Sequence, residues 1–283
     1  MNYIKKVLLL GGTGKMGKAL NSALSKEYDI TSVGSKDLNV RNENEVRKII
    51  KSNEPDIVIN TVAFLGIDPC EKDPIKAFEM NMMHPMRLAE ISNEFGFLLV
   101  HFSTDAVFSD IKSDESYDEY SMPNPVNVYG MTKLGGDMMV QEISKKFYLT
   151  RISVLFGDND KNNQFVEKML YRINSGASEI NIADDIIGTP CYSKDVALSI
   201  KNLIESDLEY GLYHVVNDGK GSLYDLMSEI SDHMETLPVI VNRASHKDFS
   251  AIGKKNTNTP LKSSKLKPMR HWKDAVKEYC KSL

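Results

Sequence analysis

VLLLGGTGKMGKAL, residues 7–20, joins an apolar run to four closely spaced glycines and then to helix-forming residues. Residues 7–10 predict a buried strand, and the residues from about 16 onward predict a helix. Gly12, Gly14 and Gly17 have the G-x-G-x-x-G spacing of a dinucleotide-binding loop. Glycines there allow a tight turn and let the backbone approach a pyrophosphate, whose charge meets free N–H groups at the start of the helix. The expected cofactor contacts in this stretch are Gly11, Gly12, Thr13, Gly14, Lys15, Met16 and Gly17.

Outward from this loop, the first half of the chain alternates short apolar runs with helical patterns, which is typical of βαβ units and a parallel sheet. We expect strands at 7–10, 30–33, 57–60, 97–103 and 148–153, and helices at 16–25, 43–51, 74–95 and 126–144. After residue 156 the regularity weakens. We expect helices there at 164–174, 195–204, 223–233 and from 272 onward, and strands at 211–216 and 239–241.

These patterns predict an α/β protein with a Rossmann-like, doubly wound parallel sheet and a smaller, partly interleaved C-terminal substrate domain. The dinucleotide-binding domain is expected at residues 1–156, completed by about 191–216, and the substrate-binding domain mainly at 157–283. A doubly wound sheet binds ligands at the carboxyl ends of its strands. The candidate site residues are therefore the polar side chains at those ends.

Composition narrows the class of partner. The 283 residues carry a formal net charge of −4 at pH 7, without the basic excess that nucleic-acid binding normally shows, so we expect no nucleic-acid partner. The apolar run at 7–10 stops at glycine and is too short for a signal peptide or a membrane span, which predicts a cytoplasmic protein without membrane contact. The three cysteines are far apart and lack zinc-binding spacing, so we expect reduced thiols.

The end of the second strand bears on the choice between NAD and NADP. An NAD site usually places a carboxylate there to hold the ribose hydroxyls, whereas this strand runs into Gly34, Ser35 and Lys36. A hydroxyl donor and a positive charge suit a 2′-phosphate, so the sequence favours NADP, with Ser35, Lys36 and Asn39 as contacts. Asp37 is close enough to keep NAD as an alternative.

Three residues have the side chains that carbonyl reduction needs. Thr104 follows the strand at 97–103, and Tyr129 and Lys133 lie one helical turn apart, hence on one face of their helix. A Tyr-x-x-x-Lys pair alone is expected about once by chance in such a chain. Hydride delivered to a ketone leaves an alkoxide that needs a proton, which Tyr129 would supply. Lys133 would lower the pKa of the phenol and hold the nicotinamide ribose, and Thr104 would donate to the carbonyl oxygen. His101, inside the strand, is expected to be a packed or hydrogen-bonded core residue.

Together, the glycine loop, NTV at 60–62, Asn81 in FEMNMMHP, STDAVF at 103–108 and YGMTK at 129–133 resemble an extended short-chain dehydrogenase/reductase. More narrowly, PDIVINTVAF, STDAVFSD, VYGMTKLGGD and DDIIGTPCYSKDVA are similar to the dTDP-4-dehydrorhamnose reductase family, and the resemblance spans nearly the whole chain.

The resemblance implies roles for individual residues. It makes Thr104, Tyr129 and Lys133 the catalytic trio, and it implies that Asn81 supports Lys133 through water, although Asn81 can equally cap or bend its helix. The remaining cofactor contacts that it implies are Asn60, Thr61, Val62, Ala63, Asn81, Tyr129 and Lys133, and the substrate contacts are Asp105, Ala106, Arg151 and Phe156.

The chain also departs from the family pattern. Ala106 stands where family members commonly carry a tyrosine that touches the sugar, which predicts a larger pocket and a differently substituted sugar. Residues 255–259 read KNTNT in place of RPxxS. Some relatives bind magnesium at a dimer contact through an acidic residue where this chain has Ala19, so we expect no metal.

The implied function is a reductase that transfers a hydride from NADPH, or NADH, to the 4-keto group of a nucleotide-linked deoxy sugar in surface polysaccharide biosynthesis, with a homodimer as a possible assembly. Two alternatives stay open. One is a non-catalytic NADP-binding regulatory subunit, and the other is a nucleotide-sugar epimerase of the same fold.

Overall fold

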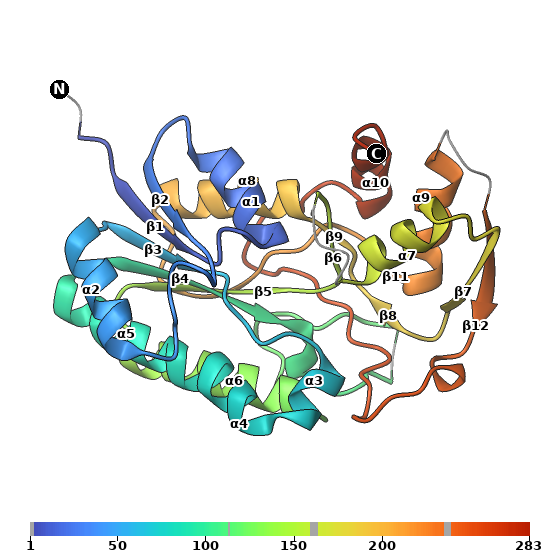
Figure 1. The fold of residues 1–283 in the computed structure, drawn as a ribbon, viewed down its shortest axis with the longest axis horizontal. Coiled ribbons are helices and arrows are strands. Elements are labelled where there is room, and N and C mark those ends of the chain that lie inside the picture. Colours follow the sequence, from blue (N-terminus) through green and yellow to red (C-terminus); the bar gives the residue numbers. More distant parts are fainter. Residues whose placement is uncertain (1–2, 113, 159–163, 235–238) are drawn as a thin grey trace.

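Six parallel strands form the central sheet, in the order β10-β5-β4-β3-β1-β2 (Figure 1). The structure is a computed structural model that describes residues 3–112, 114–158, 164–234 and 239–283. The strands are β1 (Lys6–Leu10), β2 (Asp29–Val33), β3 (Ile57–Asn60), β4 (Leu98–Thr104), β5 (Phe147–Ile152) and β10 (Gly211–His214). The order reverses beside β1, so the cofactor crevice of a doubly wound sheet is expected at the carboxyl end of that strand.

Helices cover both faces of the sheet. One face carries α1 (Lys15–Leu24) and α8 (Ser193–Glu205), and the other carries α2 (Glu43–Asn53), α5 (His84–Phe95) and α6 (Val128–Ile143) (Figure 1). Alternate residues of β1 pack into the two resulting cores, Val7 and Leu9 toward α1 and α8, Leu8 and Leu10 toward α2 and α5. Because both faces of the strand are buried, its sequence is an uninterrupted apolar run.

A smaller lobe follows β5 in the chain (right side of Figure 1). Its core gathers large side chains, including Phe156, Tyr192 and Trp272, each at most 1% exposed. The parallel pair β7 (Glu179–Ala183) and β12 (Ile240–Ala244) supports this core. The other elements are β6 (Leu155–Phe156), α7 (Phe165–Asn174), β8 (Ile187–Gly188), β9 (Cys191–Tyr192), β11 (Gly221–Ser222), α9 (Leu223–His233), the 3-10 turn η3 (His246–Asp248) and α10 (Trp272–Cys280).

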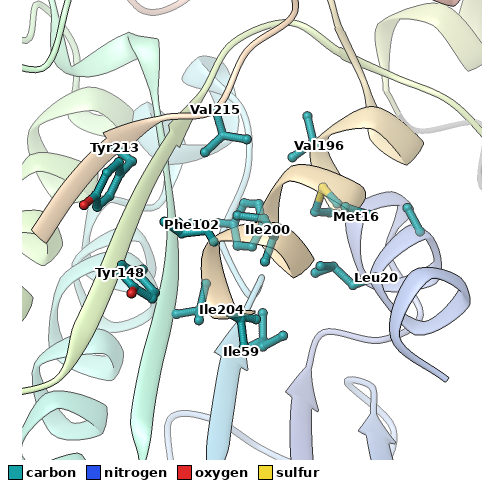
Figure 2. Close-up of a cluster of buried hydrophobic side chains, with 14 of the residues drawn as sticks. Met16, Leu20, Ile59, Phe102, Tyr148, Val196, Ile200, Ile204, Tyr213 and Val215 are labelled. Carbon is teal, nitrogen blue, oxygen red and sulfur yellow. The ribbon is translucent and has the colours of Figure 1, made fainter. Parts of the chain in front are cut away.

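The two parts of the chain are interleaved. Strand β10 pairs in parallel with β5, and α8 packs against α1, although both elements come from beyond residue 190. Figure 2 shows the result, with Val196, Ile200 and Tyr213 in one cluster with Met16 and Leu20. The predicted α/β fold with a doubly wound parallel sheet is confirmed, while the residue limits of the two domains stay a prediction.

Several elements differ from those expected. The helix expected at 74–95 is divided into α4 (Pro74–Phe78), a π-helical turn η1 (Glu79–Met83) and α5, and a short helix α3 (Ile67–Lys72) precedes it. Strand β7 was not expected, although its buried Ile180 and Ile182 alternate with exposed residues at period two, which is the usual signal of a half-buried strand. Among the described residues, no helix is long and apolar enough to span a membrane. The three cysteines are free thiols, as expected.

Candidate active site

The glycine loop between β1 and α1 is a tight turn that only glycine fits at three points. Gly11 has φ +86°, a left-handed conformation that favours glycine. A Cβ on Gly12 would lie 1.8 Å from Ser32 Oγ, and one on Gly17 would lie 2.4 Å from the carbonyl oxygen of Gly11. The loop therefore presses against β2 and against the first turn of α1. Gly14 is the N-cap of α1 without a side-chain cap, so the first N–H groups of the helix stay open to an anion.

A cavity of about 240 Å³ opens beside this loop. It lies at the carboxyl ends of β1, β2 and β3, where the reversal of strand order places a dinucleotide. The predicted cofactor residues that line it are Gly11, Thr13, Gly14, Lys15, Ser35, Thr61, Val62 and Ala63. The further lining residues are Leu10, Val33, Gly34, Leu38, Val40, Leu65, Met80 and Gln164. The glycine turn, the uncapped helix and the mostly apolar wall fit a dinucleotide.

Several predicted cofactor residues lie elsewhere. Lys36 and Asn39 are exposed and do not line the cavity, and Met16 is buried in the core (Figure 2). Asp37, the residue that kept NAD as an alternative, accepts the backbone N–H of Gly34 through Oδ2 at 2.8 Å. In this structure the carboxylate closes its own turn. Asn60 is fully buried behind the cavity.

Lys15 extends away from the glycine loop into the substrate lobe. Its Nζ donates to the carbonyl oxygen of Leu155 at 2.8 Å and lies 2.7 Å from Glu167 Oε1 on α7. The two side chains are 0% and 5% exposed. This buried ion pair joins the cofactor loop to the second lobe. The sequence expectation for Lys15 was a direct cofactor contact.

At the end of β4, Thr104 is held by a cluster of hydroxyl groups around Asp105. Thr104 Oγ1 donates to Asp105 Oδ1 at 2.9 Å and accepts the backbone N–H of Ala106 at 3.1 Å. The other carboxylate oxygen of Asp105 accepts from Ser153 Oγ at 2.7 Å and from Thr259 Oγ1 at 3.2 Å. Burial raises the pKa of Asp105, and these hydrogen bonds oppose that shift. Asp105 thus holds the Thr104 side chain in place.

Tyr129 reaches Thr104 from the first turn of α6. Asn127 caps this helix by accepting the N–H of Gly130 at 2.8 Å. A Cβ on Gly130 would lie 2.1 Å from the carbonyl oxygen of Ala106, so the glycine lets the helix start directly against the turn after β4. The Tyr129 phenol lies close enough to the Thr104 hydroxyl for Thr104 to lower its pKa. Because this contact lowers the pKa of the phenol, it favours the phenolate, toward which the rotatable Thr104 hydroxyl can turn as a donor.

Burial sets the acidity of the two functional groups on α6. It raises the pKa of the Tyr129 phenol above its ordinary value, and the contact with Thr104 works in the opposite direction. The sequence expectation was a phenol pKa lowered by Lys133. The Lys133 ammonium instead donates to the carbonyl oxygen of Phe102 on β4 at 2.6 Å. Burial lowers the pKa of Lys133 to about 8, while Asp137 raises it.

Three other predicted site residues have protein partners. Asn81 uses both donor hydrogens on Phe64 O and Thr132 Oγ1, at 3.1 and 3.2 Å, so its water-mediated support of Lys133 stays a prediction. Arg151 is 2% exposed and pairs with Asp137 at 3.1 Å. Phe156 is fully buried in the lobe core. In this structure neither Arg151 nor Phe156 is brought to the surface that a sugar would touch.

A larger cavity, of about 660 Å³, lies at the amino ends of β1, β3, β4 and β5, opposite the glycine loop. It is lined by charged and aromatic residues such as Lys5, Glu54, Lys146 and Tyr210. It contains none of the predicted site residues. Size alone therefore does not single out the candidate site, and the predicted catalytic residues Thr104 and Tyr129 lie at the end of the strands that carries the glycine loop.

Comparison with known proteins places this arrangement in a family. The sequence matches the RmlD substrate binding domain over residues 5–283. The chain belongs to this family. It is 31% identical to a spore coat polysaccharide biosynthesis protein of Bacillus subtilis, over 97% of this chain and 96% of that protein. It is 29% identical to a dTDP-4-dehydrorhamnose reductase of Aggregatibacter actinomycetemcomitans, over 92% of both.

The solved structures agree. The crystal structure of dTDP-4-dehydrorhamnose reductase from Bacillus anthracis in complex with NADP superposes with a TM-score of 0.92 at 29% identity, covering 99% of this chain and 100% of that one. The resemblance to extended short-chain dehydrogenase/reductases, and within them to the dTDP-4-dehydrorhamnose reductase family, is confirmed.

Sequence reasoning missed the contributions of the second lobe. Gln164 lines the cofactor cavity, Glu167 pairs with Lys15, and Thr259 binds Asp105. The sequence does give one signal, which is the lysine inside the glycine loop. If the side chain of that lysine is buried, it requires a buried anion from elsewhere in the chain. Which carboxylate supplies it depends on the tertiary fold.

Proposed function

We propose that the protein is a reductase that transfers a hydride from NADPH to the 4-keto group of a nucleotide-linked deoxy sugar, in surface polysaccharide biosynthesis. The observation that carries this proposal is the approach of Tyr129 to Thr104 at the carboxyl end of β4, beside the glycine-loop cavity. The relatives named dTDP-4-dehydrorhamnose reductase, and the spore coat polysaccharide biosynthesis protein, support it.

The residues of the site divide the work of the reaction. Bound NADPH would supply the hydride. Gly11, Gly14 and the first turn of α1 would hold its pyrophosphate, and Thr61 to Ala63 would line its path toward the strand ends. Tyr129 would transfer its proton to the sugar O4, and Thr104 would orient the phenol. Lys133 would hold positive charge beneath the site.

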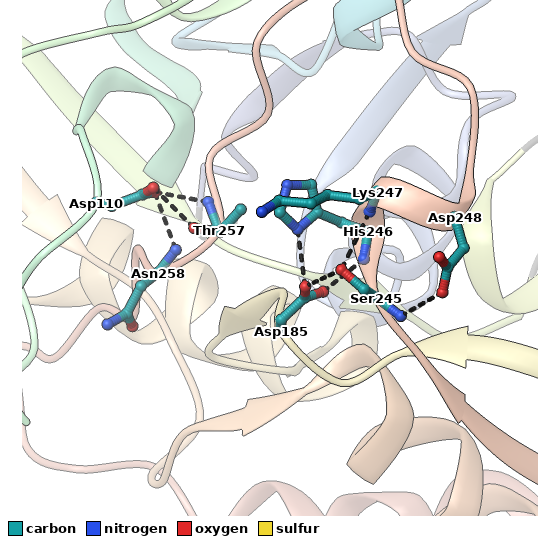
Figure 3. Close-up of polar contacts among 8 residues, drawn as sticks. All are labelled: Asp110, Asp185, Ser245, His246, Lys247, Asp248, Thr257 and Asn258. Atoms are coloured by element: carbon teal, nitrogen blue, oxygen red, sulfur yellow. Dashed lines mark hydrogen bonds and ion pairs between the residues drawn. The ribbon is translucent and has the colours of Figure 1, made fainter.

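A basic groove beside the site suits the diphosphate of the sugar nucleotide. It is about 460 Å³ in volume, and His246, Lys247, Lys254 and Lys255 are among its lining residues. Two carboxylates anchor the segment that carries these side chains (Figure 3). Asp185 accepts from Ser245 Oγ and from the backbone N–H and ring Nδ1 of His246, and Asp110 accepts from Thr257 and Asn258. Although burial works against it, these hydrogen bonds lower the pKa of Asp185 to about 2. The anchors therefore stay charged and keep the lysines in place.

The test is NADPH oxidation, followed at 340 nm, on a panel of 4-keto nucleotide sugars that differ in base and sugar. We expect turnover with at least one dTDP-linked 4-keto-6-deoxy sugar. Tight NADPH binding without turnover on the whole panel would favour the regulatory subunit, and product formation without net NADPH consumption would favour the epimerase. The nucleotide is identified separately by thermal unfolding with dTDP, UDP, GDP and CDP sugars, since a ligand at 100 times its dissociation constant adds about 2.7 kcal/mol of stability.

Replacing Lys36 by Glu is expected to weaken NADPH roughly tenfold and to leave NADH nearly unaffected. Lys36 is exposed next to Ser35, which lines the cavity, and reversing an exposed charge beside a phosphate costs about 1–2 kcal/mol. Fluorescence titration with both cofactors measures the change. Lys26→Glu, on an exposed lysine beyond the far end of α1, is the charge-matched control. Equal weakening of NADPH and NADH would contradict the proposed 2′-phosphate contact.

We further propose that the enzyme acts in the cytoplasm as a homodimer, through a face formed by α4 and α6. These helices pack together, and their exposed apolar residues include Ile75, Phe78, Met131 and Met138. Exposed apolar residues gathered on neighbouring helices are typical of a protein interface. Met138→Glu is expected to give a monomer in light scattering, whereas Met122→Glu, on a more exposed methionine elsewhere, is expected to change nothing. A wild-type monomer at all concentrations would refute the dimer.

A further inference from the structure

A chain of four buried polar side chains runs from Lys133 into the interior of the protein. Lys133 Nζ lies 3.4 Å from His101 Nε2, and His101 Nδ1 lies 3.1 Å from Asn60 Nδ2. On the far side, His84 Nε2 lies 3.3 Å from Asn60 Oδ1. All four residues are at most 2% exposed. Because buried polar groups are normally paired, the positions of the hydrogens follow from the donors and acceptors around them.

Asn60 is the fixed point of this chain. Its Oδ1 accepts the backbone N–H of Val62 at 3.2 Å, and a backbone N–H can only donate. Turning the side-chain amide over would place Nδ2 against that N–H, so that two donors would face each other without an acceptor. Asn60 therefore keeps Oδ1 toward Val62 and His84, and Nδ2 toward His101.

This orientation decides the tautomer of His101. Asn60 Nδ2 is a donor, so His101 Nδ1 must accept, and the single hydrogen of the neutral imidazole then lies on Nε2, facing Lys133. Burial keeps the pKa of His101 well below its ordinary value, so the ring is neutral. An imidazole N–H can pair with a neutral amine, which has a lone pair, but not with an ammonium group, which has none.

We propose that His101 is a positioning residue for Lys133, whose Nε2–H, fixed by Asn60 and the Val62 amide, stabilises the neutral amine of the lysine. Two other groups around Lys133 favour its charged form and so oppose the effect of His101. The Phe102 carbonyl accepts from the ammonium and favours the charged form. Asp137 favours it too, although its pairing with Arg151 reduces that effect. The titratable and charged groups near the lysine are Tyr129 and Asp137 on α6, His101 on β4, Arg151 on β5 and His84 on α5.

The consequence for the reaction rests on the proposed function. After Tyr129 gives its proton to the sugar oxygen, the tyrosinate must be reprotonated before the next turnover. An N–H bond of the Lys133 ammonium breaks, an O–H bond forms on Tyr129, and the neutral amine that remains is the form that His101 pairs with. Solvent then returns one proton to the lysine. His101 thus stabilises the lysine state left after each proton transfer.

The tautomer itself is tested on the wild-type protein, with and without NADPH. Long-range ¹H–¹⁵N spectra distinguish imidazole Nε2–H from Nδ1–H, and His101 is assigned by comparison with His101→Gln. We expect the Nε2–H form. An Nδ1–H form would overturn the proposal, whether or not the enzyme reduces any sugar, so this result is independent of the proposed activity.

The effect on Lys133 is measured by NMR titration of lysine ε-¹³C, assigned with Lys133→Arg. His101→Gln can turn an amide oxygen toward the ammonium, so we expect the pKa of Lys133 to rise by about one unit. The alkaline limb of kcat/KM is expected to move up with it. His84→Gln, which keeps a donor for Asn60, is the matched control and is expected to leave both unchanged. An unchanged Lys133 pKa in His101→Gln, or an equal shift in the control, would refute the role.

Discussion

Replacing Tyr129 by Phe is expected to lower turnover by roughly 10²-fold or more and to leave NADPH affinity nearly unchanged, because loss of a general acid typically costs that factor. The change removes only the phenol oxygen, which lies close to Thr104. The phenol lies outside the cavity that holds the cofactor. Single-turnover kinetics with saturating NADPH measures the chemical step, and fluorescence titration measures binding.

The control for this change is Tyr171→Phe, which removes the same oxygen from a tyrosine on α7 that is 58% exposed. Turnover in the control is expected to equal that of the wild type. If Tyr129→Phe also retains wild-type turnover, the proton comes from another group, and Asp105, whose pKa is raised by burial, is the next candidate. A loss of NADPH affinity in step with turnover would indicate instead that the phenol supports the cofactor.

Much of the fold is readable from the sequence because local and tertiary preferences agree there. The apolar run of β1 is buried on both faces. The glycines that follow it leave no space for a Cβ, because Gly12 lies against Ser32 and Gly17 lies against the loop itself. The break in the helix expected at 74–95 has a local signal that the prediction overlooked, because Pro85 follows the break directly and lacks the backbone N–H of a continuous helix. Its π-helical turn lies where Gly136 of α6 approaches the carbonyl oxygen of Asn81, a contact between segments far apart in the chain.

The sequence predicts which residue types form the candidate site better than it predicts where their side chains point. Thr104 and Tyr129 meet as expected, since the end of a strand and the first turn of a following helix are placed by the fold alone. Asn60 was expected to contact the cofactor, and Arg151 and Phe156 the sugar, but all three side chains are buried. The direction in which such a side chain points depends on partners that lie elsewhere in the chain, such as Asp137 for Arg151. The local sequence does not reveal these partners.

The buried pair of Lys15 and Glu167 links the cofactor loop to the lobe proposed to bind the sugar. Replacing Lys15 by Met is expected to lower the free energy of unfolding by about 3–5 kcal/mol, because it leaves the Glu167 carboxylate buried without its cation. Burial already lowers the pKa of Lys15, which shows that desolvation weighs on this pair. Urea unfolding, monitored by circular dichroism, measures the loss.

The double variant Lys15→Met with Glu167→Leu is expected to recover most of that stability, because an apolar pair of similar volume usually replaces a buried ion pair at little cost. Lys201→Met is the control for loss of a lysine, since Lys201 pairs with an exposed partner, Glu27, and is expected to cost at most about 1 kcal/mol. If the double variant is as unstable as Lys15→Met, the pair itself stabilises the fold, and the argument from desolvation is wrong. If it is stable but binds NADPH more weakly than the wild type, the pair serves to hold the glycine loop in its binding shape, which is the outcome we expect from its position between the two lobes.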